Sequence, residues 1–297
     1  MDNIKVSLII SVFNEERNLP KALDSAVFQS LKELEIICVN DGSEDYTSRI
    51  LELYAMKYPN IRIISQTNLG SGNAFNKALL LSRGEYISIL SAKDILDLDA
   101  MSKMYDIAKK NDSDIVFAPF GVFDDELEFE KNKNLNKVFY PIPRYLKEKT
   151  LKPEELYSFL FEIPPVSWGK LIKKSYLDEN KVCFMENLSY KDLLFLVEII
   201  LKAKRIITLD EICYYHKKSP KEDWKKLDLF DVYKRLEELL KELRAPKSII
   251  KSFREHKKAS LVEYYGTISD KKIKPKYRSN LVKIYPEFYF KKIKWTF

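Results

Sequence analysis

Residues 5–16 read KVSLIISVFNEE, a nearly continuous apolar run that ends in three polar residues. A parallel strand covered on both faces by helices has this pattern, because neither of its faces meets water. An amphipathic stretch follows, in which Leu19, Leu23 and Ala26 recur at helical spacing. The chain therefore opens with a strand, a polar loop and a helix.

The same alternation continues to about residue 120. Strand-like runs are LEIICVN (34–40), IRIIS (61–65), EYISIL (85–90) and DIVFAPF (114–120), and helix-like runs lie between them at 45–57, 72–82 and 99–110. Strands that alternate with helices over short connections predict a layered α/β fold, with a Rossmann-like, largely parallel sheet and flanking helices.

Polar loops follow the first four strand runs. They read NEE (14–16), NDGS (40–43), QTNLGSG (66–72) and SAKD (91–94). In an open α/β sheet, ligands bind outside the carboxyl ends of the strands. These loops therefore form the candidate site, and their polarity suits a nucleotide.

The pattern changes after residue 120. The segment 121–150 is polar and rich in Lys and Glu, which predicts a hairpin or a loop excursion. From residue 153 onward helices dominate, over 153–162, 189–203, 222–244 and 248–264. The sequence thus predicts a nucleotide-binding N-terminal half and a helical C-terminal half.

Composition limits the class of protein. Hydrophobic residues make up 45% and charged residues 32% of the 297 residues, which allows a sizeable core and argues against wholesale disorder. The longest apolar run, LLFLVEIIL, contains Glu198 and is too short to span a membrane. The N-terminus lacks the basic region and cleavage site of a signal peptide, and the three cysteines are too scattered for a disulfide framework or a zinc site. We therefore expect a cytoplasmic protein.

The net charge of +7 is unevenly distributed. Residues 271–297 contain nine Lys or Arg residues and one acid, so residues 1–270 together carry a charge of −1. A basic tail indicates an anionic partner, either a membrane surface or a nucleic acid. A lysine-rich solvated surface is the commoner explanation of such a run.

The stretch NDGSEDYTSRI (40–50) has two interpretations. Asp41 can accept a hydrogen bond from a base N–H, and Gly42 permits the backbone to approach a ligand closely. The same letters also form an ordinary Asp-Gly turn, in which Ser43 or Asp45 caps the next helix.

A glycine-rich loop, NLGSGNAFN, occupies residues 68–76. It lacks the third glycine of a dinucleotide fingerprint, and it has no Gly-Lys-Ser/Thr. The loop therefore supports neither a Rossmann dehydrogenase nor a P-loop enzyme.

The order and spacing of these segments resemble the family 2 glycosyltransferases, which have the GT-A fold. The resemblance rests on VSLIISVFNEE, ICVNDGSEDYT, NLGSGNAFN and RGEYISIL in the first half, and on VSWGKLIKKSYLDENKVCF, ENLSYKDLLFLVEIIL and LDEICYYHKKS beyond it. It covers roughly residues 4–220. It implies a nucleotide-sugar-binding and catalytic domain over 1–220, followed by a basic helical extension over 221–297.

The resemblance implies a nucleotide site at the first strand end and at the Asp-Gly-Ser turn. There Phe13 would contact the base or ribose, Glu15 would lie nearby, and Asp41 would hydrogen-bond the base. Ser11 replaces a common Pro and Asn40 replaces a common Asp, and both changes are mild. Further nucleotide contacts implied by the resemblance are Gly70, Asn76 and Asp94.

Two positions depart further from the family pattern. Phe75 stands where the family usually has an Arg that helps to bind the diphosphate, so one cation is missing. Ser91, Ala92, Lys93 and Asp94 stand where the family has Asp-Ser-Asp-Asp, whose carboxylates hold a divalent ion. Asp94 alone remains as a weak metal ligand. The resemblance therefore implies that no metal is required, or that Mg or Mn is used weakly.

Lys93 offers a cation in place of that metal. Its ammonium could screen the departing diphosphate as a point charge. A solvated lysine on a decayed site is an equally good interpretation. Asp97 and Asp99 repeat an Asp-x-Asp, but they stand at the polar start of a helix, where capping is the stronger interpretation.

Asp192 is the catalytic base that the resemblance implies. In the family, an Asp at the start of this helix lies under the acceptor hydroxyl and removes its proton during attack on the anomeric carbon. Its usual neighbour, a Glu, is Lys191 here. A helix N-terminal Asp stabilised by the dipole is the structural alternative. Trp168 and His216 are candidate acceptor contacts, although a lone His beside tyrosines is more often structural.

These residues predict an inverting glycosyltransferase for cell-envelope polysaccharide biosynthesis. It would move a sugar from a nucleoside-diphosphate sugar, by preference UDP-linked, to a glycan or lipid-linked acceptor. The alternative is a catalytically inactive, nucleotide-binding homologue that acts as partner or scaffold of another transferase. Asp41 and Asp192 favour the enzyme, whereas Phe75, Ser91 and Lys93 favour the inactive homologue. We expect no nucleic-acid partner, because no reading module is recognisable.

The last residues, KIYPEFYFKKIKWTF (283–297), interleave aromatic rings with lysines. Such a segment suits the headgroup boundary of an anionic bilayer, which would place the protein at the inner face of the membrane. Packing of the rings as a final strand or helix is an equally good interpretation.

Overall fold

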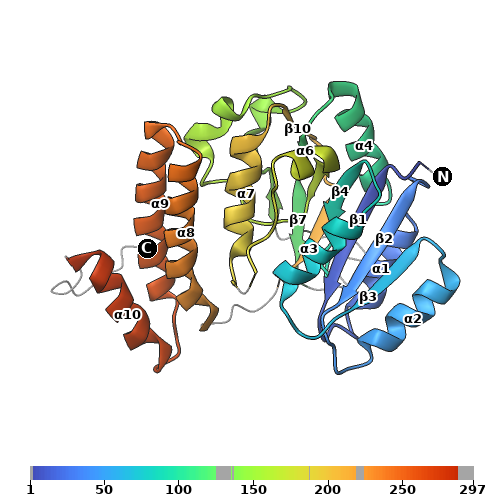
Figure 1. Ribbon diagram of the computed structural model, residues 1–297, viewed down its shortest axis with the longest axis horizontal. Coiled ribbons are helices and arrows are strands. Elements are labelled where there is room, and N and C mark those ends of the chain that lie inside the picture. Colours follow the sequence, from blue (N-terminus) through green and yellow to red (C-terminus); the bar gives the residue numbers. More distant parts are fainter. Residues whose placement is uncertain (1–2, 125–134, 136, 187, 219–223, 287–297) are drawn as a thin grey trace.

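The computed structural model describes residues 3–124, 135, 137–186, 188–218 and 224–286, with a twisted seven-stranded sheet at its centre (Figure 1). The strands lie in the order β10 (Ile206–Thr208), β6 (Ile115–Phe117), β9 (Lys170–Lys173), β4 (Tyr86–Ile89), β1 (Val6–Val12), β2 (Leu34–Asn40) and β3 (Ile61–Ser65). Only β9 runs antiparallel to its neighbours in this sheet. The predicted α/β fold with a largely parallel sheet is confirmed.

Helices cover both faces of this sheet. They are α1 (Leu19–Val27), α2 (Thr47–Lys57), α3 (Ser71–Leu81) and α4 (Ala100–Asn111) in the first half. Successive residues of a strand point to opposite faces. Ile9 of β1 therefore packs in one core with Ala78 of α3, and Leu8 in a second core with Leu23 of α1. Because both faces are covered, β1 and β2 read as continuous apolar runs.

The predicted strand 114–120 is two strands in two sheets. The first is β6, and the second is β7 (Phe120–Phe123), with Pro119 between them. The second sheet has the order β5 (Ile95–Leu96), β11 (Tyr214–Lys217), β7 and β8 (Lys137–Phe139). The antiparallel pairing of β7 with β8 agrees with the predicted hairpin. Part of that hairpin, residues 125–134, lies outside the described residues.

The helical C-terminal half is also present, with corrections of detail. Residues Pro153–Phe159 form a 3-10 helix, η2, rather than an α-helix. The other helical segments are η1 (Arg144–Leu146), α6 (Lys174–Glu179), α7 (Lys191–Lys202), η3 (Trp224–Asp228), α8 (Leu229–Glu242), α9 (Lys247–Gly266) and α10 (Ile273–Ile284). The α6 and α10 helices were not predicted, because short or proline-containing helical runs give a weak periodic signal.

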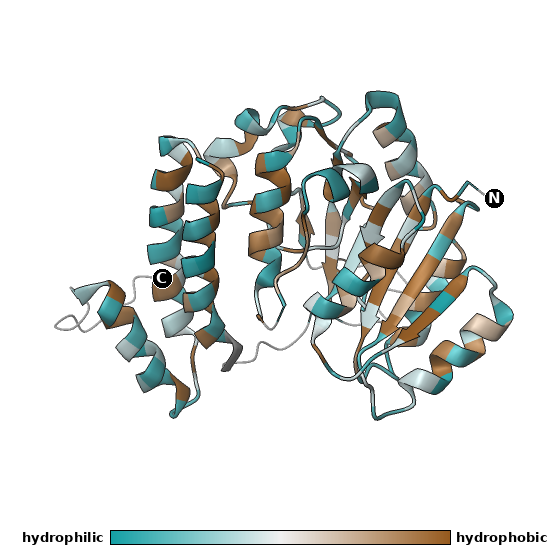
Figure 2. Ribbon diagram, viewed as in Figure 1, coloured by the Kyte–Doolittle hydropathy of each residue, from teal (hydrophilic) through white to brown (hydrophobic). Residues whose placement is uncertain are grey.

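The C-terminal helices continue the core on the α3 face of the sheet. Leu196 of α7, Leu236 of α8 and Leu261 of α9 are fully buried in the same core as Ile9. Apolar residues run along the central strands and face inward on α8, while the outer faces of α8 and α9 are polar (Figure 2). Within the described ranges, no helix is both long and apolar enough to cross a membrane.

Candidate functional site

The loops after β1 and β2 are joined by hydrogen bonds at the carboxyl edge of the sheet. The backbone N–H of Asn14 donates to Ser43 Oγ at 3.0 Å, and that of Glu15 donates to Thr47 Oγ1 at 2.9 Å. In return, the N–H of Glu44 donates to Asn14 Oδ1 at 2.8 Å. Ser43 therefore braces the first loop instead of capping the next helix. The pairing holds the polar loops in one arrangement.

In the part of the chain that the structure describes, no side chain caps α2, whose N-cap residue is Tyr46, and Asp45 stands just before that residue. Its Oδ1 accepts from the N–H of Thr47 at 3.0 Å, and its Oδ2 accepts from the N–H of Glu16 at 3.1 Å. Burial opposes its ionisation, but hydrogen bonds from Thr47 and Glu16 outweigh that effect and lower the pKa of the Asp45 carboxyl.

Asp41 lies at the junction of three strand ends and is almost fully buried. Its Oδ1 accepts from Gln66 Nε2 at 2.8 Å and from the N–H of Leu69 at 2.9 Å. Gly42 has a φ of +77°, and a Cβ there would lie 2.9 Å from the backbone nitrogen of Asn68. The glycine thus lets the β2 loop and the β3 loop approach each other beside Asp41.

Gln66 was not singled out from the sequence, although it heads the polar loop after β3. Its Nε2 binds Asp41, whereas its Oε1 is buried and accepts no hydrogen bond from the described part of the chain. Such unpaired buried acceptors are rare in folded proteins, and each calls for an explanation. A ligand N–H would satisfy this one.

The remaining nucleotide candidates surround this junction. Ser11 is half-buried near the end of β1, and Phe13 follows it with 43% of its surface exposed. Gly70 precedes α3 with a φ of +85° and open space where a Cβ would stand. Asn76 differs from these residues. Its amide binds the backbone of Phe184 at both ends, at 2.9 and 2.8 Å, so it fixes the loop that precedes α7.

Lys93 is ion-paired with Glu15. Its Nζ lies 3.2 Å from Glu15 Oε1, and 39% of its side chain remains exposed. The other oxygen of Glu15 accepts from Asn18 Nδ2 at 2.8 Å, and Asn18 Oδ1 in turn accepts from Lys217 Nζ at 2.9 Å. Two lysines are therefore held at this edge by one carboxylate and one amide.

Asp94 is completely buried, and its carboxylate accepts hydrogen bonds from the β11 strand. Its carboxylate accepts from Tyr214 Oη at 2.7 Å and from the N–H of Lys217 at 2.9 Å. His216 Nδ1 lies 3.0 and 3.1 Å from its two oxygens. Burial and the adjacent Asp94 both raise the pKa of the Tyr214 hydroxyl, which therefore stays protonated and donates.

This environment does not suit a divalent ion. A metal ligated by Asp94 would have to displace the donors from Tyr214, His216 and Lys217. Among the residues with a described placement, no group of three or more His, Cys, Asp or Glu side chains could hold a metal ion. Asp97, the other acidic candidate, accepts from the N–H of Asp99 at 3.3 Å just before α4. Asp99 is the N-cap residue of α4, but within the described ranges no side-chain hydrogen bond caps the helix, so the structure does not show the expected capping.

Trp168 and His216, the two acceptor candidates, lie together in an aromatic cluster. The Trp168 ring stacks on Tyr214 at 4.4 Å between centroids and on His216 at 4.9 Å. Phe120 meets the same ring edge-on at 4.7 Å. The cluster forms because β7 and β11 are parallel neighbours in the second sheet.

Phe75 and Lys191, two departures from the family pattern, are neighbours. Lys191 Nζ lies 5.9 Å from the Phe75 ring centroid and donates to Ser71 Oγ at 2.7 Å. Gly72 permits this approach, since a Cβ there would lie 2.6 Å from the carbonyl oxygen of Met185. A cation absent from position 75 is thus present at the same contact, on α7 instead of α3.

Asp192 follows Lys191 in the first turn of α7. Its Oδ1 is buried and accepts no hydrogen bond within the described residues. Lys170, on β9, is buried in the same region and donates to the carbonyl oxygens of Val166 and Trp168 at 2.5 and 3.2 Å. Burial lowers the pKa of Lys170 to about 7, and the charge of Asp192 opposes this shift.

Hydrogen bonds connect these residues into one candidate site. Asp41 binds Leu69, the loop of Leu69 leads to Ser71, and Ser71 binds Lys191 beside Asp192. The sequence showed Lys191 only as a lost Glu and did not indicate Lys170, Tyr214 or Lys217 as parts of the site. The signal that could have indicated Lys191 was that positions 75 and 191 both depart from the family pattern.

Comparison with known proteins agrees with this architecture. The family described as "Glycosyl transferase family 2" matches residues 7–169. The chain is 31% identical over 212 residues to a cholesterol galactosyltransferase of Borreliella burgdorferi, covering 71% of this chain and 59% of that protein. It is also 31% identical over 220 residues to a poly(ribitol-phosphate) beta-glucosyltransferase of Bacillus spizizenii, covering 72% of this chain and 32% of that protein.

The fold also matches a solved structure. Staphylococcus aureus TarS, residues 1–349, in complex with UDP-GlcNAc superposes with a TM-score of 0.60 at 20% identity, covering 98% of this chain and 76% of that one. At this identity the likeness shows the fold alone. The chain spans well under two thirds of the length of both curated relatives.

Proposed function

Because the chain belongs to glycosyl transferase family 2, we propose that it is an inverting glycosyltransferase that uses a nucleoside-diphosphate sugar, UDP-linked by preference. One observation carries the proposal. Of the three buried side-chain atoms without a partner in the described residues, two are acceptors at the candidate site, Gln66 Oε1 and Asp192 Oδ1. One lies beside Asp41 and the other in the first turn of α7. Their places correspond to the base end and the acceptor end of a nucleotide-sugar site.

At the base end, Asp41 and Gln66 would read the nucleotide. Gln66 Oε1 is an acceptor that needs a donor, and uracil offers its ring N–H. Phe13 supplies an exposed ring for contact with the base or ribose, and Ser11 and Gly70 line the approach. The complex of the structural relative TarS with UDP-GlcNAc supports the choice of UDP.

Lysine side chains would replace the metal at the diphosphate. Lys93 stands at the altered metal position, and its pairing with Glu15 holds the ammonium in place while leaving part of it accessible. Lys191 of α7, which donates to Ser71 in the first turn of α3, is the second cation. The N-terminus of a helix carries a partial positive charge that favours anions, and the ammonium of Lys191 adds to that positive charge. We therefore propose that sugar transfer requires no metal. The alternative is weak use of Mg or Mn at Asp94.

At the acceptor end, Asp192 would act as the base. The acceptor oxygen attacks the anomeric carbon, the bond from that carbon to the diphosphate oxygen breaks, and Asp192 Oδ1 takes the acceptor proton. The charge that develops on the leaving diphosphate is stabilised by Lys93 and Lys191. Trp168 and His216 would contact the acceptor.

The acceptor would be a glycan or a lipid-linked molecule of the cell envelope. The two curated relatives act, by their names, on cholesterol and on poly(ribitol phosphate). An acceptor of this kind lies at or near a membrane. We therefore propose a cytoplasmic protein that works at the inner face of the membrane, with the tail 283–297 as one contact, and without a nucleic-acid partner.

Titration calorimetry with UDP, in Mn²⁺ and in chelator, tests the proposal. We expect binding in both conditions, its loss in Asp41→Ala, and turnover that survives chelator. Lys93→Ala should lower the rate at least about tenfold, the size of a lost charge-assisted contact. Lys110→Ala on exposed α4 is the matched control and should leave the rate unchanged. No UDP binding in either condition would remove the proposal, and full sensitivity to chelator would return the metal to Asp94.

The second candidate function is a non-catalytic homologue that binds nucleotide and serves as partner or scaffold of a transferase. The apolar Phe75 and the absent carboxylates at 91 and 93 favour it. A screen of nucleotide sugars for hydrolysis separates the two, since an inactive homologue binds UDP but releases no sugar.

A further inference from the structure

The last described helix, α10, is rich in cations. Residues 271–284 contain six Lys or Arg residues and no acid. Tyr277 and Leu281, four residues apart, are fully buried and hold the helix against its neighbours. Tyr277 Oη also donates to the carbonyl of Leu261 on α9 at 3.0 Å. The anchoring is therefore apolar, and the charged residues lie on the other faces of the helix.

On the neighbouring helices, some of the cations are paired with acids. Arg235 on α8 pairs with Glu242 at 2.9 Å, and Lys257 on α9 pairs with Glu237 at 3.4 Å. Lys271, Arg278 and Lys283 are exposed, and none has an ion pair in the described structure. Exposed unpaired cations add little to folding stability. Their concentration on one helix therefore needs another explanation.

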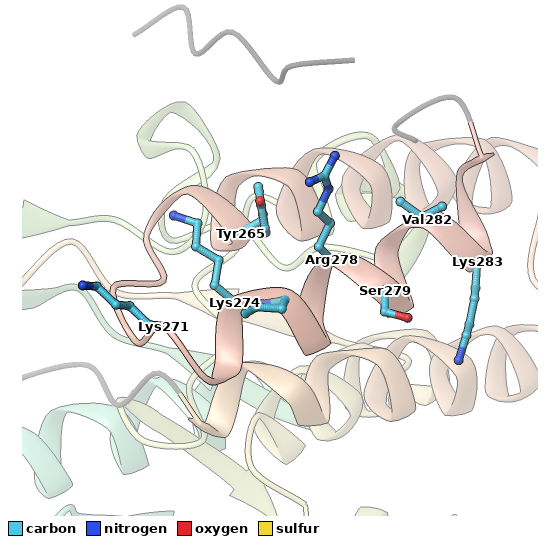
Figure 3. A pocket seen from close by; sticks show the side chains of 8 residues that line it. Tyr265, Lys271, Lys274, Arg278, Ser279, Val282 and Lys283 are labelled. Atoms are coloured by element: carbon cyan, nitrogen blue, oxygen red, sulfur yellow. The ribbon is translucent and has the colours of Figure 1, made fainter. Parts of the chain in front are cut away.

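These side chains line a groove between the end of α9 and α10. Its volume is about 930 Å³, and its residues are Tyr265, Lys271, Lys274, Pro275, Arg278, Ser279, Val282 and Lys283. Figure 3 shows Tyr265, Lys274 and Arg278 extending to the same side, with Val282 further along the helix. Lys274 lies 5.2 Å from the Tyr265 ring centroid and donates to the carbonyl of Ile268.

The groove carries only one sign of charge. No carboxylate belongs to the part of its lining that the structure describes. Asp270, the nearest acid in the chain, accepts from the backbone N–H groups of Lys272 and Ile273 at the start of α10. The remainder of the chain after residue 286 has three lysines and one acid, so it does not complement the groove. Among the described residues, therefore, no acid of the chain neutralises the groove, and its charge suits an anion from outside the chain.

We propose that this groove binds the phosphate headgroup of an anionic lipid, and that α10 thereby docks the protein on a membrane surface. Lys271, Lys274 and Arg278 would contact the phosphate. Pro275 and Val282, with the Tyr265 ring, give the groove an apolar floor between the cations, and Ile284 is 39% exposed at the end of the same helix. Cations interleaved with apolar side chains match the boundary between headgroups and acyl chains.

Nucleic acid is the other polyanion to consider. A nucleic-acid site would present stacking rings or base-reading polar groups beside its cations. The groove has one ring, Tyr265, which Lys274 already contacts, and beside its cations it otherwise offers Pro275, Ser279 and Val282. The proposal rests on the proposed function in one respect: a transferase with a lipid-linked acceptor gains from a position at the membrane. Vesicle binding itself requires neither UDP nor turnover.

Cosedimentation of the full chain with vesicles tests the groove. Vesicles of phosphatidylcholine with one quarter phosphatidylglycerol should pellet the protein, and pure phosphatidylcholine should not. The variant Lys271→Glu with Arg278→Glu should bind at least about 30-fold more weakly, since each basic residue near an anionic surface contributes about fivefold. The control variant is Lys110→Glu with Lys149→Glu, which changes the net charge by the same amount at exposed lysines of α4 and the η1 region. It should bind vesicles within threefold of wild type.

Several results would overturn the proposal. The first is wild-type protein that binds vesicles equally well with and without phosphatidylglycerol, and the second is an equal loss of binding in the two charge-reversal variants. The third is release from vesicles by millimolar inorganic phosphate at matched ionic strength. The fourth is tighter binding of a DNA duplex than of vesicles. If Lys271→Glu with Arg278→Glu fails to fold by circular dichroism, Lys271→Gln with Arg278→Gln replaces it. UDP affinity should be unchanged in all these variants. A wild-type protein that binds vesicles but not UDP would reject the proposed function and retain the groove.

Discussion

At the scale of single residues, hydrogen-bond satisfaction separates structural carboxylates from reactive ones. Asp94 is buried, and donors from β11 occupy both of its oxygens. Asp192 has a buried oxygen with no partner in the described chain. A satisfied buried carboxylate fixes its donors in place, whereas an unsatisfied one costs stability unless a ligand completes it. The first property suits an architectural residue and the second suits a proton acceptor.

Asp192→Asn should lower sugar transfer about 100-fold or more, because the amide keeps the shape of the side chain but cannot accept the proton. UDP affinity should stay within about twofold of wild type. Initial rates at saturating donor, with calorimetry for UDP, measure the two effects. Asp231→Asn, in the first turn of α8, is the control for a helix N-terminal Asp and should not change the rate. Transfer by Asp192→Asn within a few-fold of wild type would place the base elsewhere.

Lys170 predicts a pH dependence of stability. Its pKa is lowered by burial to about 7, so between pH 7 and 8.5 the unfolded chain binds a proton that the folded chain does not. The free energy of unfolding should therefore rise with pH in this window, by about 1.5 kcal/mol from this group. Below pH 7 both states are protonated and the contribution is lost.

Urea unfolding at pH 7.0, 7.5, 8.0 and 8.5 measures this slope. In Lys170→Met the slope should nearly vanish, while the variant is less stable at every pH because the carbonyls of Val166 and Trp168 lose their donor. The control is Lys110→Met, which should keep the wild-type slope. An unchanged slope in Lys170→Met would show that the ammonium stays protonated when buried.

At the scale of elements, the contact between α3 and α7 joins the two ends of the site. Lys191 bonds Ser71 at the first residue of α3, and Asn76 of α3 holds the loop before α7. The small residue Gly72 lets the loop reach α3. The loop proposed to read the base and the first turn of α7 are thereby placed by one pair of helices, so we expect a change on α7 to affect the proposed diphosphate region.

Lys191→Ala should weaken UDP binding about tenfold, because it removes a cation from the proposed diphosphate position. If Lys191 only braces Ser71, the variant removes no contact with UDP. Calorimetry with UDP and with uridine separates these cases. Affinity for uridine should be unchanged, because the nucleoside lacks the phosphates. Lys191→Arg should restore most of the UDP affinity. Equal losses for UDP and uridine would make Lys191 a structural residue.

At the scale of the whole molecule, the helical C-terminal half shares its core with the sheet. Leu236 of α8 and Ile9 of β1 belong to one buried cluster, which also contains Leu196 of α7. The division into domains 1–220 and 221–297 stays a prediction from the sequence. A shared apolar core favours a single cooperative unit, because removing one side exposes the other to water.

Leu236→Ala should lower the free energy of unfolding by about 2–5 kcal/mol, the usual cost of a large-to-small change in a core. Calorimetry should show one transition in both proteins, shifted as a whole in the variant. The exposed Leu80→Ala on α3 is the control and should shift it little. A second transition, with only one of the two lowered by Leu236→Ala, would support two independently folding domains.

The sequence by itself determined the fold class, and it predicted where the candidate site lies. Continuous apolar runs at 5–13 and 34–40 arise when both faces of a strand are covered, so the letters alone predict a parallel sheet and its polar carboxyl edge. The strands β9 and β10 escaped prediction, because each is three or four residues long and gives too little periodicity.

Tertiary structure decided what the polar residues do. Asp94 is satisfied by β11, which is about 120 residues away in the chain, and Lys191 meets Phe75 from a different helix. Burial and hydrogen-bond satisfaction depend on such distant partners, and a local pattern carries no record of them. The sequence therefore located the site, whereas packing determined which of its charges are engaged and which oxygens remain open to a ligand.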